Sequence, residues 1–364
     1  MKLIYNLFYN LLPVKKVNTD SQLFLLTAEE IKTIHRKETI AVWLAAFTGA
    51  VGVVLLYLPQ YTYPGFFNNT TVIFFAKKFI LPVTLIVYAI ILVVIEILLL
   101  TLLNIWCAHE IAVATGFLNY QLKKEKRNLL INISLEKKNK EILHYGIDPL
   151  QGINKKALLA CNFFFILKAT LSNMLFKIFI QRALGRYALK TVQDFAGIPI
   201  FALWNAYGTK VILKEARVII MGQNLIEEVC KLIRKDQRPT DAFKNLLYDT
   251  LQYIAISKRD FHQNHFFLTK NLFDIYNIQP KEKHLLEDDY YKKLQAAGKE
   301  EREVCQLLIS IGFLLDGRLS LHEKGQIKEL QAEGLLDIGA AEIKKYQQDF
   351  LNGKGIDGLI KKYI

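Results

Sequence analysis

The sequence lacks the patterns that mark the common catalytic and metal centres. It has no GxSxG nucleophile elbow, no Walker lysine and no HExxH pair. Its few cysteines lie far apart without a CxxC pair, which argues against zinc and disulfide frameworks and predicts reduced, packed thiols at Cys107, Cys161, Cys230 and Cys305. We therefore expect a non-enzymatic protein that holds no metal and no cofactor.

Two short patterns imitate functional motifs. Residues 353–358 match GxGxxG literally, but no strand precedes them, so a turn that ends a helix is the better interpretation. His262 and His265 are three residues apart, and Asp260 and His284 would have to complete a zinc site that needs three or four ligands. We interpret these histidines as structural.

Charge is nearly absent from residues 79–103, where Glu96 is the only ionisable group. A helix of this length rises about 1.5 Å per residue and covers the roughly 30 Å of a bilayer's hydrocarbon core. The stretch therefore predicts a membrane-spanning helix. Glu96 is a candidate functional residue, because a charge held in hydrocarbon costs several kcal/mol. The alternative is a carboxyl group bonded to a polar group of the other span or of a second subunit.

A second span is predicted upstream. Thr27 and Glu30 form a capping box that predicts a helix start, and the helix should continue into a span at about residues 40–58 and end at Pro59. Small residues near one face of this span let another helix approach closely: Ala41, Ala45, Gly49 and Gly52. The fold class predicted is all-α, with a two-span transmembrane hairpin and helical bundle modules.

The distribution of basic residues predicts the orientation of the hairpin. Lysines and arginines precede the first span and follow the second, whereas the connection between the spans has only Lys77 and Lys78. By the positive-inside rule both termini face the cytoplasm. The net charge of +13 is concentrated in residues 123–234, with 19 basic against 8 acidic residues. This basic excess favours an anionic lipid surface, or is an ordinary positive-inside flank; no nucleic-acid-binding motif accompanies it. The lipid-headgroup candidates next to the span are Lys123, Lys124, Lys126 and Arg127.

Residues 181–217 resemble the EcsC family of bacterial membrane-associated proteins. The likeness lies in Gln181-Arg182-Ala183-Leu184-Gly185-Arg186, Gly197-Ile198-Pro199, Trp204-Asn205-Ala206-Tyr207-Gly208 and Glu215-Ala216-Arg217. The resemblance implies a membrane-associated helical module linked to transport and secretion. Arg182 and Arg186 are further lipid-headgroup candidates because guanidinium groups bind phosphate, the alternative being plain solvation.

Residues 311–323 resemble the Asp-Gly turn of TerB-like domains. Asp316 and Gly317 end one helix, and Ser320 and Glu323 form a capping box that opens the next. The resemblance implies a cytoplasmic helical module of stress-response and membrane-linked complexes. A weaker copy of this helix-turn-helix, about 58 residues earlier, would place residues 257–261 at the turn.

The chain is thus predicted to have five parts. Residues 1–38 hold an amphipathic helix at 3–12 and a lead-in helix. Residues 39–127 hold the transmembrane hairpin, whose second helix extends to about Arg127. A linker at 128–154, the EcsC-like module at 155–236 and the TerB-like domain at 237–364 follow.

We expect a two-pass protein of the bacterial inner membrane that acts as a scaffold or regulatory subunit. The alternative is an accessory component of a transporter or secretion complex that acts on lipid or ions. The expected partners are the bilayer and unidentified proteins, which include a second copy of the chain.

Overall fold

The computed structural model describes residues 2–12, 26–67, 70–74, 77–118, 123–134, 141–151, 194–195, 197–233, 239–260 and 262–364. The fold is all-α, as predicted, apart from one two-stranded ribbon. The chain divides into two compact units, each built from discontinuous segments. The hairpin unit comprises residues 1–12, 36–107 and 153–213, and the C-terminal unit comprises residues 13–35, 108–152 and 214–364.

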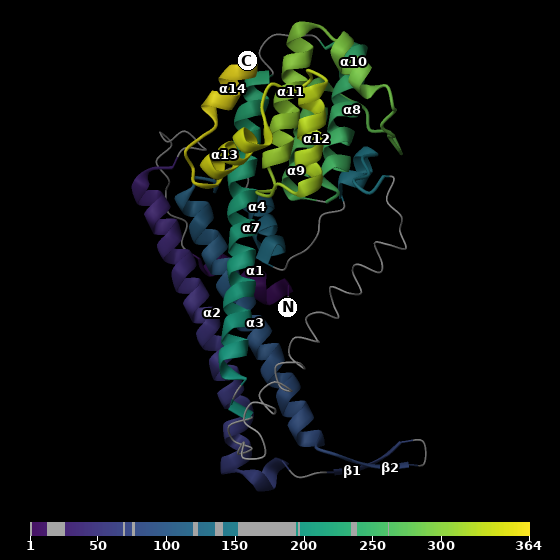
Figure 1. Ribbon diagram of the computed structural model, residues 1–364. Coiled ribbons are helices and arrows are strands. Elements are labelled where there is room, and N and C mark those ends of the chain that lie inside the picture. Colours follow the sequence, from purple (N-terminus) through teal and green to yellow (C-terminus); the bar gives the residue numbers. More distant parts are fainter. Residues whose placement is uncertain are drawn as a thin grey trace. The chain divides into compact units, whose positions relative to one another are not determined.

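Two long helices dominate the hairpin unit (Figure 1). They are α2 (Ala28–Thr62) and α3 (Val83–Ala114), and the short helix α1 (Lys2–Leu11) belongs to the same unit. Both α2 and α3 are long and apolar enough to span a membrane. The predicted capping box opens α2: the Thr27 amide donates to Glu30 at 2.8 Å, and the Glu30 amide donates to the Thr27 hydroxyl at 3.2 Å.

The prediction that the first span ends at Pro59 is wrong, because Pro59 lies inside α2. A proline within a helix leaves the carbonyl four residues earlier without its N–H donor. Here the hydroxyl of Tyr88, on α3, donates to that Leu55 carbonyl at 2.8 Å. The neighbouring helix thus supplies the missing hydrogen bond, which removes part of the cost of continuing past the proline.

The second span also differs from its predicted limits. Phe79 to Leu81 belong to strand β2 (Lys77–Leu81), which pairs antiparallel with β1 (Thr70–Phe74). The helix α3 begins only at Val83, after Pro82. At the other end the helix does not continue to Arg127: it stops at Ala114, because Gly116 takes a left-handed φ of +68° and the Phe117 amide turns back to the Ala112 carbonyl. The short 3₁₀ helix η1 (Pro64–Phe67) lies in the connection between the spans.

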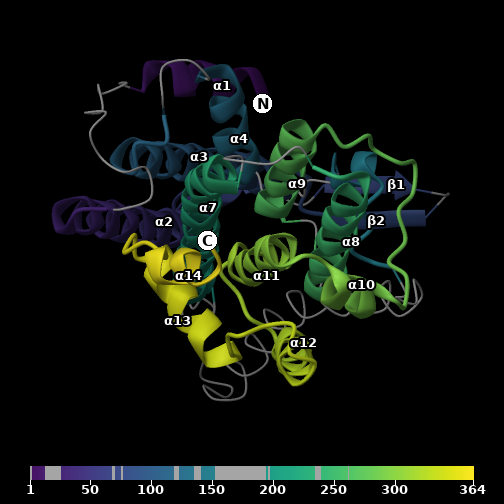
Figure 2. The ribbon, with the colours of Figure 1, turned by 90° about the horizontal axis from the view of Figure 1, so that it is seen from above.

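The C-terminal unit is a helical bundle arranged around α11 (Lys299–Leu314). Figure 2 shows α11 between α8 (Asp241–Lys258) on one side and α13 (Ala340–Leu351) with α14 (Asp357–Tyr363) on the other. The remaining helices are α4 (Lys123–Ser134), α9 (Gln263–Tyr276), α10 (Tyr290–Ala296) and α12 (Leu321–Ala332), with η3 at Glu141–Tyr145. The long helix α7 (Ile198–Ile233) gives residues to both units. The helix α4 runs into the linker predicted at 128–154, so part of that linker is helical. Leu130 and Ile131 of α4 are buried.

Two local predictions are confirmed in this unit. Gly353 and Gly355 have positive φ and lie in the turn between α13 and α14, so the GxGxxG match is a turn that ends a helix. The thiols of Cys230 and Cys305 are reduced and buried, and burial raises the pKa of each to about 12, which keeps them protonated. Cys107 is also buried, and Cys161 lies outside the described residues.

Candidate functional site

Glu96 makes a polar contact inside the hairpin unit. Its Oε1 accepts a hydrogen bond from the amide of Asn205, on α7, at 2.6 Å. Gly52 of α2 faces the same carboxyl group, because a Cβ at that position would lie 3.4 Å from Oε2. The sequence suggested a partner in the other span or in a second subunit. The partner found is instead on α7.

The predicted Asp-Gly turn is built around a buried lysine of the C-terminal unit. Lys258, the last residue of α8, has a fully buried side chain. Its ammonium group donates to Asp316 at 2.7 Å and to the carbonyl of Phe313 at 2.9 Å, and it also pairs with Glu323. A buried charge is tolerated only when it is paired and hydrogen-bonded, as here.

The capping box predicted after this turn is present. The Glu323 amide donates to the Ser320 hydroxyl at 3.3 Å, and the Glu323 carboxylate accepts from the Ser320 amide at 2.5 Å. Gly317 has φ +67° at the turn, and Arg259 has φ 52° at the end of α8. These two left-handed residues are 58 residues apart, but Arg259 directly follows α8 whereas Gly317 is the third residue after α11.

The histidines considered as zinc ligands do not converge. His262 caps α9 by accepting the Asn264 amide at 3.2 Å, and its Nε2 lies 3.0 Å from Glu215. His265 bonds to the Gly312 carbonyl at 2.9 Å, and burial lowers its pKa to about 3, so it is neutral. Burial opposes ionisation of Glu215, but the hydrogen bond from His262 and the attraction to His262 and Arg318 together outweigh it and lower the pKa of Glu215. Both histidines are thus held by contacts within the C-terminal unit.

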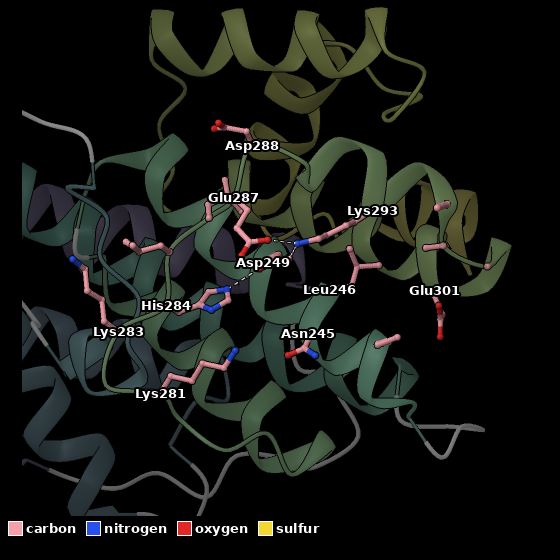
Figure 3. A pocket seen from close by; sticks show the side chains of 16 residues that line it. Asn245, Leu246, Asp249, Lys281, Lys283, His284, Glu287, Asp288, Lys293 and Glu301 are labelled. Atoms are coloured by element: carbon pink, nitrogen blue, oxygen red, sulfur yellow. Dashed lines mark hydrogen bonds and ion pairs between the residues drawn. The ribbon is translucent and has the colours of Figure 1, made fainter.

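A polar groove opens on the C-terminal unit between α8, α10 and the segment from Lys281 to Asp288 (Figure 3). Its volume is about 1180 Å³. Both charge signs line it, in side chains that the sequence did not single out together: Asp249, Lys281, Lys283, His284, Glu287, Asp288, Lys293 and Glu301.

Asp249 is the fixed centre of this groove (Figure 3). It is nearly buried, and it accepts a hydrogen bond from Nε2 of His284 at 2.8 Å while Lys293 lies 3.8 Å away. The His284 ring stacks on Tyr248 at 3.9 Å, which fixes its orientation. Hydrogen bonds to Glu287 and Asp289 raise the pKa of Lys293. The groove thus holds a buried Asp249–His284 pair surrounded by exposed charged side chains, which suits a polar or charged ligand.

The sequence could not have found this groove. Asp249 lies in the middle of α8, and His284 is in an irregular segment 35 residues later. No short sequence spacing links the two residues, because they are brought together only by tertiary packing.

The predicted lipid-headgroup candidates are only partly described. Lys123, Lys124 and Lys126 lie in the first turns of α4, and the side chain of Arg127 is partly buried there. Arg182 and Arg186 lie outside the described residues.

Comparisons with known proteins assign no family. No family model matches the chain, and neither a curated protein nor a solved structure matches it.

Proposed function

We propose that the protein is a two-helix membrane anchor that presents the C-terminal unit to cytoplasmic protein partners as a scaffold or regulatory subunit. One observation carries the anchor: the most apolar stretch of α3 has no buried residue, and many of its large apolar side chains are more than a third exposed. Exposed apolar surface of this extent is stable only against lipid or another apolar surface.

The groove of the C-terminal unit supports the partner-binding role. A cleft of about 1180 Å³ lined by both charge signs fits a polypeptide segment that carries basic and acidic side chains. The basic flanks of the spans favour a cytoplasmic location for both termini. The EcsC-like and TerB-like resemblances favour a bacterial inner membrane, with a role in envelope stress or in membrane-linked complexes.

Site-specific photo-crosslinking in cells tests this role. A photoreactive amino acid replaces Leu285, which lines the groove and is 48% exposed, or Leu321, which is 85% exposed at the start of α12. A discrete crosslinked species is expected from position 285 and not from 321. Identical patterns from both positions would argue against a partner in the groove.

An accessory role in transport is the second candidate, and the Glu96–Asn205 bond favours it. A carboxyl group between apolar helices is costly and is often functional. Glu96→Gln separates the two functions, because glutamine keeps an oxygen for Asn205 but removes the carboxyl group that could bind an ion or a proton. A scaffold would keep its crosslinks and its activity in cells. Loss of activity with unchanged crosslinks would favour the transport role.

A further inference from the structure

The first half of α7 exposes large apolar side chains within the hairpin unit. Leu203 is 71% exposed and Tyr207 is 62% exposed, and Phe201, Trp204 and Val211 are each more than a third exposed. From Ala216 to Ile226 the same helix is almost entirely buried. A soluble helix would carry polar side chains on an exposed face. The first half of α7 therefore needs an apolar environment.

The first half of α7 runs antiparallel along α2. Near the end of α2 the Tyr61 hydroxyl donates to Asp194 at 2.7 Å. Further along, a Cβ added to Gly49 would lie only 2.5 Å from the Phe201 carbonyl, so the two backbones touch there. As the chain advances from residue 194 to residue 201, its contacts on α2 move back from residue 61 to residue 49.

This pairing sets the depth that α7 covers. Continued one residue for one from Gly49 and Phe201, it places Lys210 level with Ile40, where the first span is predicted to begin. From Gly197 to Lys210, α7 therefore accompanies most of the span. At about 1.5 Å per residue this part is about 20 Å long, about two thirds of the roughly 30 Å of a hydrocarbon core. Lys210 is exposed at its end, where a long stem can carry the charge to the headgroups.

The amide of Asn205 is satisfied within the unit. It donates to Glu96 of α3, so each side chain lowers the cost of burying the other. Leu203 and Tyr207 are exposed on the side of α7 that faces away from α2 and α3.

We propose that α7, from about Gly197 to Lys210, is a further membrane helix that packs on α2 and α3 and faces lipid acyl chains with its exposed side. This inference rests on the proposed function, because it takes α2 and α3 as membrane spans. Lipid is the occupant because the exposed apolar surface of α7 continues that of α2 and α3 within one unit. Asn205 and Lys210 lower the mean hydropathy of this stretch, so its composition alone does not indicate a membrane helix.

The proposal fixes the direction of α7 relative to the hairpin. α3 runs antiparallel to α2, since Tyr88 bonds to Leu55 and Lys37 lies over the ring of Trp106 at the opposite end. α7 also runs antiparallel to α2, so α3 and α7 are parallel. The beginning of α7 therefore lies at the same membrane face as the connection between α2 and α3.

Tryptophan quenching by brominated lipid tests where α7 lies. Two full-length variants each keep one tryptophan: W43F/W106F keeps Trp204 of α7, and W106F/W204F keeps Trp43 of α2, which is 73% exposed. Each is reconstituted into phosphatidylcholine vesicles with or without bromine on the acyl chains. We expect quenching of Trp204 to be at least half of that of Trp43. Acrylamide in the water phase should quench both weakly.

The outcomes separate this inference from the proposed function. Strong bromolipid quenching of Trp43 with none of Trp204 overturns the α7 proposal and leaves the hairpin intact. Absence of quenching in both variants, when both are folded by circular dichroism, overturns the membrane anchor itself.

Labelling with a membrane-impermeant maleimide tests at which membrane face α7 begins. Asp194→Cys is compared in intact cells with Gly65→Cys in the connection of the hairpin and with Gly325→Cys in α12; both glycines have open space around them. Asp194→Cys is expected to react from the same side as Gly65→Cys and from the opposite side to Gly325→Cys. Reaction only after permeabilisation, together with Gly325→Cys, would refute the parallel arrangement of α3 and α7.

Discussion

At the scale of single residues, Lys258 shows how a buried charge holds a turn. Its ammonium group lies among carboxylates and carbonyls contributed by α11, α12 and the turn between them. Each partner is positioned by another device: Glu323 by the capping box, and Asp316 by accepting the Arg318 amide at 3.1 Å. The lysine thus ties the end of α8 to the Asp-Gly turn.

Lys258→Met should destabilise the C-terminal unit strongly. Removal of one member of a buried ionic network leaves the carboxylates of Asp316 and Glu323 without their counter-charge, which typically costs about 3–5 kcal/mol. Urea unfolding of the full chain in mild detergent, followed by circular dichroism, measures the loss. Lys328→Met, on an exposed position of α12, is the matched control and should change little. Equal effects of the two substitutions would contradict the role of Lys258.

His265 predicts the acid sensitivity of the same unit. Its pKa is about 3 in the fold and 6.5 ordinarily, so the unfolded chain binds the proton first. The stability is complete above about pH 6.5 and falls as pH decreases towards 3, by up to about 1.4 kcal/mol per pH unit.

Unfolding free energies measured at pH 7, 6 and 5 check this dependence. His265→Gln should be less stable at pH 7 but should lose less stability on acidification. Glu215, whose pKa is lowered, loses its stabilising charge only at lower pH and does not interfere in this range. Parallel pH profiles for wild type and variant would show that another group is responsible.

At the scale of elements, the hairpin unit depends on close helix contacts. The backbones of α2 and α7 touch at Gly49, where an added Cβ would be 2.5 Å from Phe201 O and 2.7 Å from the Asn205 amide. Gly208 lies in the same helix α7 and has nothing within 4 Å. The two glycines therefore have different roles, although the sequence marks both only as small residues.

Gly49→Ala should destabilise the α2–α7 contact, whereas Gly208→Ala should be neutral or slightly stabilising. Alanine is favoured over glycine in a helix by about 1 kcal/mol, so any loss at position 49 must come from the clash with α7. Thermal unfolding in the same detergent compares the pair, and Gly49→Ala is expected to lower the midpoint by several degrees. A rise at both positions would mean that α7 does not pack there.

At the scale of the whole molecule, apolar surface and basic charge make different demands on a membrane. The exposed side chains of α2 and α3 require hydrocarbon, while the lysines that follow the second span add only an electrostatic attraction that salt screens. The full chain should stay in the membrane fraction after washes with about 1 M salt, which shortens the electrostatic screening length to about 3 Å. It should also stay there after washes with alkaline carbonate. Release by salt alone would show that charge, not a span, holds the protein.

The sequence by itself determined the helical class, the two long apolar helices and the local signals. The capping boxes at Thr27 and Ser320 and the turn at Gly317 depend on neighbours a few residues apart, so they are readable without a fold. The limits of the helices were less predictable. Pro59 predicted a helix end by local rules, but the helix continues, and the hydroxyl of Tyr88 from another helix bonds to the carbonyl that the proline leaves without a donor.

Only the tertiary structure decided which distant groups meet. Glu96 and Asn205 are 109 residues apart, and Asp249 meets His284 across 35 residues. No periodicity encodes these pairs, because each partner looks like an ordinary polar residue of its own segment. Glu96 was noticed for its apolar surroundings, but its partner, the groove around Asp249 and the apolar exposure of α7 follow from packing, which brings together faces that the linear sequence keeps apart.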